Sequence, residues 1–278
     1  RWMVGVEAIP AAIYTLFALG LPKSPRWLLT RGAAAEAAVI LKRIGSELTV
    51  DRLQQDMAQS ATSGAKQEHI FMGKYRFPLA LAFLIALFNQ FSGINAFLYY
   101  APRIFEEAGL GETTAVLSSI GIGFTNLVFT LLGIYLSDRV GRRHLLYIGS
   151  VGYIISLGLV AAAFILEWSG IMVPVFLCIC IAAHAIGQGA VIWVFISEIF
   201  PNHLRGSGQS FGTSIHWILA WLIPSSIPVL FSWVGPGPVF AFFAFMMVLQ
   251  LLFVHFMMPE TKGISLEALS EKLSGGKK

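Results

Sequence analysis

Seven apolar runs, each about long enough to cross a lipid bilayer, limit what this chain can fold into. A helix needs roughly 17–25 residues to span about 30 Å of hydrocarbon. The runs lie at about Met3–Leu21, Phe77–Ala101, Thr114–Leu136, Leu145–Leu166, Ile171–Ile196, Ser207–Trp233 and Gly237–Met258. Because a bilayer offers no hydrogen bonds to an unpaired backbone, we predict that all seven are helices and that the chain is an all-α integral membrane protein.

The composition supports a membrane protein and argues against several other classes. Hydrophobic residues make up 56% of the chain and charged residues only 12%, against roughly 25% charged residues in soluble domains. The basic residues lie between the apolar runs and form no continuous stripe, so we expect no nucleic-acid partner. The two cysteines, Cys178 and Cys180, point to different sides of the helix expected there. We predict no disulfide, no metal site and no cofactor.

The distribution of lysine and arginine predicts the topology. Of the 19 such residues, all except Arg1 and Arg103 fall on the same side when the seven runs are threaded back and forth through a bilayer. Lysine and arginine are enriched on the cytoplasmic side of membrane proteins. We therefore expect a multi-pass protein of the plasma membrane, with residues 22–76 and the C-terminal tail in the cytoplasm.

The long polar segment after the first run divides the chain into four parts. We predict the last transmembrane helix of a preceding half at residues 1–21, a cytoplasmic helical linker at 22–76, a six-helix bundle at 77–258 and a cytoplasmic tail at 259–278. Within the linker, helix formers at Ala33–Ile44 and an amphipathic pattern at Leu48–Met57 predict short helices. The small polar residues of Ala61–Gln67 predict a flexible joint.

We also expect the chain to be a fragment. It opens without methionine, inside an apolar run. Six-helix blocks are the repeating halves of many transporters, whose substrate sites lie between the halves. A single half is not expected to transport by itself. The N-terminal half of the same protein is therefore an expected partner, together with membrane lipid.

Polar residues from Gln90 to Asn95 interrupt the second apolar run. A side-chain amide offers both a donor and an acceptor, so it can bind neighbouring hydroxyl groups of a ligand without carrying charge. On an ideal helix, Gln90 and Asn95 would point about 140° apart. They face one pocket if the helix breaks at Ser92 and Gly93, or if the pocket wraps around the helix. The alternative is hydrogen bonding between helices with no ligand involved.

Five motifs stand in a fixed order along the chain. They are Pro22–Leu29 (PKSPRWLL), Gln90–Asn95 (QFSGIN), Asp138–Arg143 (DRVGRR), Ser197–Pro201 (SEIFP) with the Arg205–Gly206 pair, and Pro259–Gly263 (PETKG). Their order and spacing resemble the sugar porter family of the major facilitator superfamily, from the first residues to the last motif. The resemblance implies the end of the sixth helix, the intracellular helical domain and helices seven to twelve of a bacterial-type hexose or pentose transporter, in the bacterial inner membrane.

The same resemblance implies a set of substrate-binding residues on four helices. They are Asn89, Gln90, Asn95 and Tyr99 on the seventh helix, Asn126 on the eighth, Gly189 and Trp193 on the tenth, and His216 and Trp217 on the eleventh. Asn126 has helix–helix hydrogen bonding as its alternative role, and Trp193 has an interfacial one. His216 stands where relatives carry an amide. It is expected to bind sugar as a neutral imidazole, the alternative being a proton-coupling role.

Charged residues at the expected cytoplasmic helix ends form a second set. The resemblance implies that a salt-bridge network closes the cytoplasmic side of the transporter, with members Asp138, Arg139, Arg142, Arg143, Glu198, Arg205 and Glu260. Exposed ion pairs contribute only about 0–1 kcal/mol each, which suits a latch that must open. Topology-setting charge is the alternative for the arginines. Lys23 replaces the family's usual glutamate, so one acidic partner of the network is either absent or supplied from elsewhere. Tyr99 and Tyr100 are expected to form the external gate.

We therefore predict transport of a monosaccharide by alternating access, with proton symport in the full-length parent. Sugar and protons are the expected substrates. A membrane sugar sensor without transport and a facilitator of a polyol such as inositol are the alternatives. An enzyme is not expected, because no nucleophile–base pair or metal-spaced cluster stands at a common depth in the sequence.

Overall fold

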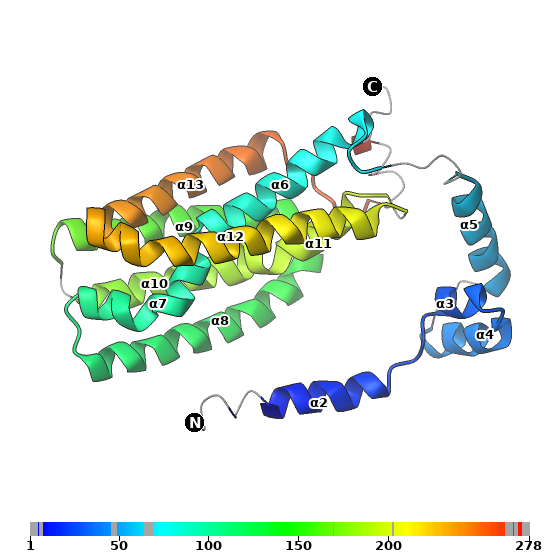
Figure 1. The fold of residues 1–278 in the computed structure, drawn as a ribbon, viewed down its shortest axis with the longest axis horizontal. Coiled ribbons are helices and arrows are strands. Elements are labelled where there is room, and N and C mark those ends of the chain that lie inside the picture. The colour runs from blue at the N-terminus through cyan, green and yellow to red at the C-terminus, as the bar shows by residue number, and fades with distance from the viewer. Residues whose placement is uncertain are drawn as a thin grey trace. The chain divides into compact units, whose positions relative to one another are not determined.

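The computed structural model describes residue 5 and residues 8–45, 49–63, 69–168, 170–201, 203–264, 269, 272 and 273. The chain divides into two compact units, Arg1–Gln67 and Glu68–Lys278, and each unit is described by itself (Figure 1). All regular secondary structure in the described part is helical. The prediction of an all-α protein is confirmed.

The described residues of the first unit form four short helices. They are α2 (Ala8–Leu19), α3 (Pro25–Thr30), α4 (Ala34–Arg43) and α5 (Val50–Ser63). Helix α2 has 12 apolar-rich residues and buries none of them within the unit. It is too short to be counted as a membrane span by itself, and part of the predicted run Met3–Leu21 lies outside the described residues.

Helices α3 to α5 bury a small core around Leu28, Leu41 and Leu53. The helices predicted at Ala33–Ile44 and Leu48–Met57 are present. Helix α5 continues to Ser63, so the joint predicted at Ala61–Gln67 is wrong for its first three residues. The reason is that no glycine or proline interrupts the stretch from Val50 to Ser63. The rest of that predicted joint lies outside the described residues.

The second unit contains the membrane-spanning segments. The helices are η1 (Gly73–Tyr75), α6 (Arg76–Phe91), α7 (Ile94–Glu107), α8 (Glu112–Val140), α9 (Arg142–Ile165), α10 (Met172–His184), the π-helical η2 (Ala185–Gly189), α11 (Ala190–Glu198), α12 (Arg205–Val234) and α13 (Pro236–Phe256). Among the described residues, 6 helical segments are long and apolar enough to cross a membrane. They coincide with the last six predicted runs and lie alongside one another in Figure 1.

Aromatic side chains fill the interior of the bundle near the start of α7 and α13. Phe240 stacks on Phe97 with ring centroids 5.4 Å apart and on Phe164 at 5.5 Å. By contrast, α8 and α12 leave most of their apolar surface uncovered, including Phe124 and Trp221. Cys178 and Cys180 are both free, and the described residues contain no cluster of three or more potential metal ligands.

Candidate functional site

The apolar run Phe77–Ala101, which corresponds to the family's seventh helix, is broken at Ser92 and Gly93. Helix α6 ends at Phe91, Gly93 has a φ of +79°, and α7 begins at Ile94. A Cβ atom on Gly93 would lie 2.6 Å from Cζ of Phe97. Ser92 Oγ donates a hydrogen bond of 2.6 Å to the Asn89 carbonyl, which satisfies one of the last acceptors of α6. Of the two alternatives that the sequence left open, the structure therefore has the helix break, and only glycine fits its centre.

The break brings three amides together. Asn95 Nδ2 donates to Gln90 Oε1 at 2.9 Å, and Gln90 Nε2 donates to Asn89 Oδ1 at 3.2 Å. Gln90 and Asn89 are buried, and Asn95 is half-buried. An unbroken helix would hold Gln90 and Asn95 on different faces. The change of direction at Gly93 is what allows the two side chains to meet.

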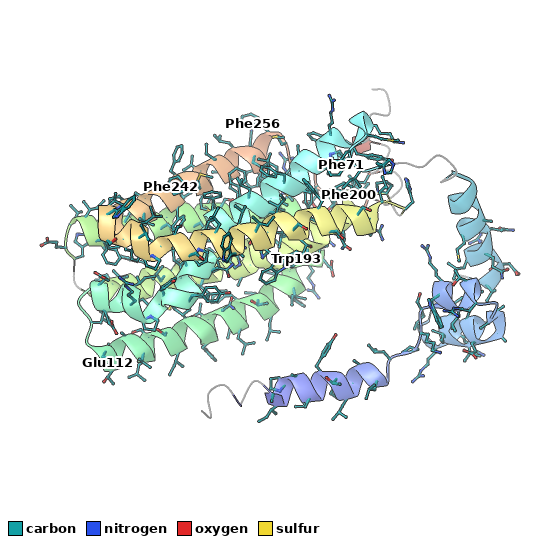
Figure 2. The ribbon with its side chains drawn as sticks, viewed as in Figure 1. Phe71, Glu112, Trp193, Phe200, Phe242 and Phe256 are labelled. Atoms are coloured by element: carbon teal, nitrogen blue, oxygen red, sulfur yellow. The ribbon has the colours of Figure 1, made fainter. Side chains whose placement is uncertain are left out.

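Helix α12 adds an imidazole to these amides. Both ring nitrogens of His216 lie 3.1 Å from Gln90 Nε2, which donates to whichever nitrogen is unprotonated. The rings of Trp193 and Trp217 lie edge-on to the His216 ring, with centroid distances of 4.8 Å and 5.3 Å. Trp193 is labelled in Figure 2. We call Asn89, Gln90, Asn95 and His216 the amide cluster. It draws residues from α6, α7 and α12, with Trp193 of α11 beside it.

The predicted binding residues Tyr99, Asn126 and Gly189 lie outside the amide cluster, as does Tyr100, which was predicted only as part of the external gate. Tyr99 on α7 is exposed, and Tyr100 packs partly buried on the bundle core. Asn126 is half-buried on α8 and makes no side-chain hydrogen bond to a described residue. Gly189 ends η2, where an added Cβ would lie 3.4 Å from the imidazole of His184. None of these four has a hydrogen bond to the amide cluster within the described part of the chain.

The amide cluster can recognise a neutral ligand that carries several hydroxyl groups. Its donors and acceptors satisfy one another when no ligand is bound, so no buried charge has to be neutralised. Each hydroxyl of a ligand can take over one such bond as donor or acceptor. An analogue that lacks the hydroxyl would leave an amide unpaired, and this is a strong basis for selectivity. The indoles of Trp193 and Trp217 supply apolar faces for C–H groups.

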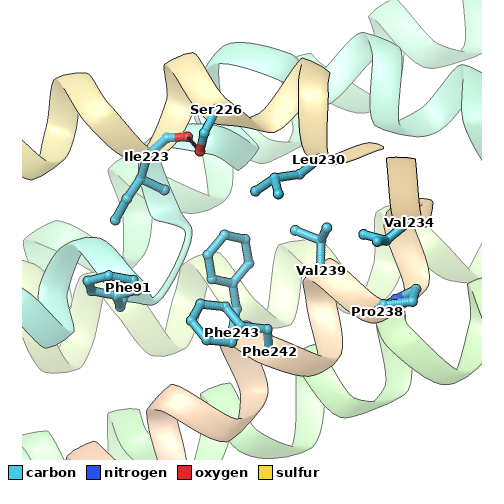
Figure 3. A pocket seen from close by; sticks show the side chains of 9 residues that line it. All are labelled: Phe91, Ile223, Ser226, Leu230, Val234, Pro238, Val239, Phe242 and Phe243. Carbon is cyan, nitrogen blue, oxygen red and sulfur yellow. Dashed lines mark hydrogen bonds between the residues drawn. The ribbon is translucent and has the colours of Figure 1, made fainter. Parts of the chain in front are cut away.

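A largely apolar cavity of about 370 Å³ lies elsewhere in the bundle (Figure 3). Its lining residues are Phe91, Ile223, Ser226, Leu230, Val234, Pro238, Val239, Phe242 and Phe243. The Ser226 hydroxyl is its one side-chain polar group, and it donates to the Ile223 carbonyl at 2.7 Å. The cavity therefore lacks the donors and acceptors that a sugar needs, and the amide cluster is the better candidate.

The charged residues gather at the start of α9. Glu260, beyond α13, accepts hydrogen bonds from the backbone N–H groups of Arg142 at 3.0 Å and Arg143 at 3.1 Å. These two residues form the first turn of α9, where a negative charge is favoured by the helix dipole. Gly141 precedes them with a φ of +100°, and a Cβ there would lie 2.6 Å from a Glu260 oxygen. Glu260 thus caps α9 from a distant part of the sequence.

The hydrogen bonds also control the acidity of this carboxyl. Burial acts to raise the pKa of Glu260, but backbone N–H donors outweigh it and hold that pKa below its usual value. The donors belong to Lys262, Arg142, Arg143 and Thr261. Glu260 is therefore a carboxylate at neutral pH.

Arg142 connects three further segments. Its Nη2 lies 3.0 Å from Glu198 Oε1 at the end of α11 and 3.2 Å from Asp138 Oδ1 near the end of α8. Thr261 Oγ1 donates to the other oxygen of Glu198 at 2.6 Å. One guanidinium and one hydroxyl thereby tie α8, α9, α11 and the segment after α13.

Three predicted members of the salt-bridge network form no ion pair with the described acidic residues. The guanidinium of Arg139 lies over the ring of Tyr135 at 4.1 Å. Arg143 donates to the carbonyls of Val254 at 3.2 Å and His255 at 2.6 Å. Arg205 buries Nε and Nη2 without a hydrogen-bond partner. Within this unit, much of the cluster is held by backbone groups rather than by paired charges.

Comparison with known proteins agrees with the motifs. The profile of the family described as "Sugar (and other) transporter" matches residues 1–273. The chain belongs to this family. It is 36% identical over 276 residues to the arabinose-proton symporter of Bacillus subtilis and 33% identical over 275 residues to the D-xylose-proton symporter of Escherichia coli. It spans only 59% and 56% of those two relatives, while 98% and 97% of its own length is matched.

Solved structures of family members have the same fold. A structure of the proton:xylose symporter XylE bound to 6-bromo-6-deoxy-D-glucose superposes with a TM-score of 0.83 at 32% identity, over 98% of this chain and 59% of that one. An inward-open structure of XylE from E. coli gives a TM-score of 0.72 at 30% identity, over 98% and 56%. The chain is therefore an all-α, multi-pass membrane protein of the major facilitator superfamily.

The family motifs did not point to every polar contact in the bundle. Tyr153 and His184 form a hydrogen bond between α9 and α10, although neither belongs to a motif. Gln188 in η2 is buried, and neither atom of its amide has a hydrogen-bond partner among the described residues. A glutamine flanked by two glycines in an apolar run was visible in the sequence as a signal. Thr261 was likewise within a motif, but its contact with Glu198 was not predictable.

Proposed function

We propose that this chain supplies the substrate-binding C-terminal half of a monosaccharide transporter that works by alternating access. The amide cluster is the observation that carries the proposal. It is a neutral, mutually hydrogen-bonded group of side chains at a helix break in a membrane-spanning bundle. Hexoses and pentoses are the substrate class that this chemistry fits.

The proposal extends to the coupling ion. The relatives are named as proton symporters of arabinose and of xylose, and on that likeness the full-length parent would be a proton symporter too. The amide cluster contains no carboxylate, so we place the proton-binding group in the half that precedes this chain. On this account the protein is a transporter and not an enzyme, and it resides in the bacterial inner membrane.

The partner half is proposed from the uncovered helix faces. Helices α8 and α12 expose large apolar side chains such as Leu117, Phe124, Ile218 and Trp221. Trp217 of α12 lies on the same uncovered surface, beside His216 of the amide cluster. A second six-helix half packed there would cover the site from the other side, and lipid would surround the remaining faces.

The Glu260–Arg142–Glu198 cluster is proposed as the cytoplasmic latch. It consists of hydrogen bonds and of the ion pair between Arg142 and Glu198, whose side chains are 11% and 19% exposed. A hydrogen bond to a charged group contributes about 1.5–3 kcal/mol, so these few contacts can separate during a transport cycle.

Sugar uptake by cells that express the full-length parent tests the proposal. Labelled xylose, arabinose, glucose and galactose would be supplied with and without a protonophore, to wild-type protein and to Gln90→Ala. We expect saturable uptake of at least one sugar, a loss of at least tenfold in Gln90→Ala, and inhibition of accumulation by the protonophore. No uptake of any monosaccharide, with the protein present in the membrane, would refute the proposed function. Uptake insensitive to the protonophore would refute only symport.

A further inference from the structure

A buried tyrosine on α9 contacts the interrupted tenth helix of the bundle. Tyr153 is completely buried. Its hydroxyl is hydrogen-bonded to Nδ1 of His184, with the two rings edge-on and their centroids 6.0 Å apart. His184 is the last residue of α10 and directly precedes the π-helical segment Ala185–Gly189. The tyrosine therefore contacts the point where the tenth helix changes its winding.

The backbones of α9 and the π-helical segment are also in close contact. A Cβ on Gly187 would lie 2.9 Å from Cα of Gly149 in α9. The imidazole of His184 packs against Gly189, at the far end of the segment. The middle of the π-helical segment thus packs directly against α9, and its last residue packs against the histidine that Tyr153 holds. Trp193 follows four residues after Gly189, beside the amide cluster.

We infer that Tyr153 is a positioning residue for sugar binding. Its hydroxyl holds His184, and His184 packs against the end of the π-helical segment that leads to Trp193. The hydrogen bond thereby fixes the place of Trp193 beside the amide cluster. Neither Tyr153 nor His184 touches the ligand. The inference rests on the proposed function, because it assigns Tyr153 a role in the affinity of that same site.

Kinetics of uptake by the full-length parent test this role. Tyr153→Phe keeps the packed ring and removes the hydrogen bond to His184, so we expect the sugar KM to rise about five- to tenfold while Vmax stays within about twofold. His184→Phe removes the same bond from the other side and should raise KM to a similar degree. The double variant should be no worse than the more impaired single variant, since all three changes break the same connection.

Tyr147→Phe is the matched control. It removes a second tyrosine–histidine hydrogen bond of α9, the 2.8 Å contact with His255, which is remote in sequence from the π-helical segment. Its KM should equal that of the wild-type protein. If wild-type protein transports sugar and Tyr153→Phe has wild-type KM, or if Tyr147→Phe raises KM equally, the positioning role is wrong while the proposed function stands. If the wild-type protein transports no sugar, the proposed function itself fails.

Discussion

The side-chain amide nitrogen of Gln90 lies 3.1 Å from the imidazole of His216, although 126 positions separate the two residues in the sequence. This contact joins the broken seventh helix to α12. It also places a ring nitrogen where it can accept a hydrogen bond from the amide, which leaves the second ring nitrogen for another partner. His216 thereby extends the hydrogen-bonding surface of the amide cluster without adding a fixed charge.

Substitutions of His216 should distinguish hydrogen bonding from proton transfer. We expect His216→Gln to keep kcat/KM for sugar uptake within about threefold of wild type, because glutamine retains an acceptor and a donor at this position. His216→Leu should lower kcat/KM at least tenfold, since Gln90 would lose a partner in a buried site. Proton-driven accumulation by His216→Gln is the deciding measurement. Its loss, with downhill uptake intact, would mean that His216 carries the proton.

Gly93 should be nearly intolerant of a side chain. Gly93→Ala adds a Cβ at 2.6 Å from Phe97 and 2.8 Å from Phe243, on a backbone with φ of +79°. Strain and overpacking together should cost about 2–4 kcal/mol. Gly109→Ala is the control, because Gly109 has a φ of +87° but the Cβ added there would meet no atom within 4 Å. We expect its cost to be about 1–2 kcal/mol. Equal melting temperatures for the two variants in detergent would contradict the packing argument.

The two carboxylates that contact Arg142 should differ in their contribution to stability. Glu198 is 19% exposed and Asp138 is 82% exposed, while the arginine side chain is 11% exposed. Removing the buried partner leaves a poorly solvated charge, so Glu198→Gln should destabilise the protein by about 1–2 kcal/mol. Asp138→Asn should cost less than about 0.5 kcal/mol. Thermal unfolding of both variants tests this order, and a larger effect of Asp138→Asn would overturn it.

The capping carboxylate predicts a dependence of stability on pH. The pKa of Glu260 is lower in the folded protein than its reference value of 4.5, so ionised Glu260 stabilises the fold above that value. The contribution is lost as the pH falls through the lower folded-state pKa. The difference in melting temperature between wild type and Glu260→Gln should therefore be large at pH 7 and shrink below about pH 4.

Glu107→Gln provides the matched control for that measurement. Glu107 forms a 4.0 Å pair with Arg103 in which both side chains are nearly half-exposed. Screening by solvent should make its effect small at every pH. A pH-independent difference for Glu260→Gln, or an equally large one for Glu107→Gln, would argue against the capping role.

The sequence predicts the spans because hydrophobicity is a local property, and apolar runs mark the six membrane-spanning segments of the described residues. Ser92–Gly93 made a helix break one of two alternatives, because glycine weakens a helix without always ending it. The structure has the break. The capping of α9 by Glu260 could not be predicted from the sequence. Its acceptor oxygens meet backbone N–H groups of α9, which carry no side-chain signature. The Tyr153–His184 contact lacks a local signal as well, because helix packing alone brings the two residues together.

Equilibrium binding of a labelled sugar to the purified full-length parent tests the central claim most directly. Wild-type protein, Gln90→Ala and Gln250→Ala would be titrated with the sugar that is transported best. Gln250 is also a buried amide, but its Nε2 donates a hydrogen bond of 2.7 Å to Ser150 Oγ. Within the described residues it has no hydrogen bond to the amide cluster. We predict saturable binding to wild type and to Gln250→Ala, and at least tenfold weaker binding to Gln90→Ala. Wild-type affinity in a folded Gln90→Ala protein would contradict the account.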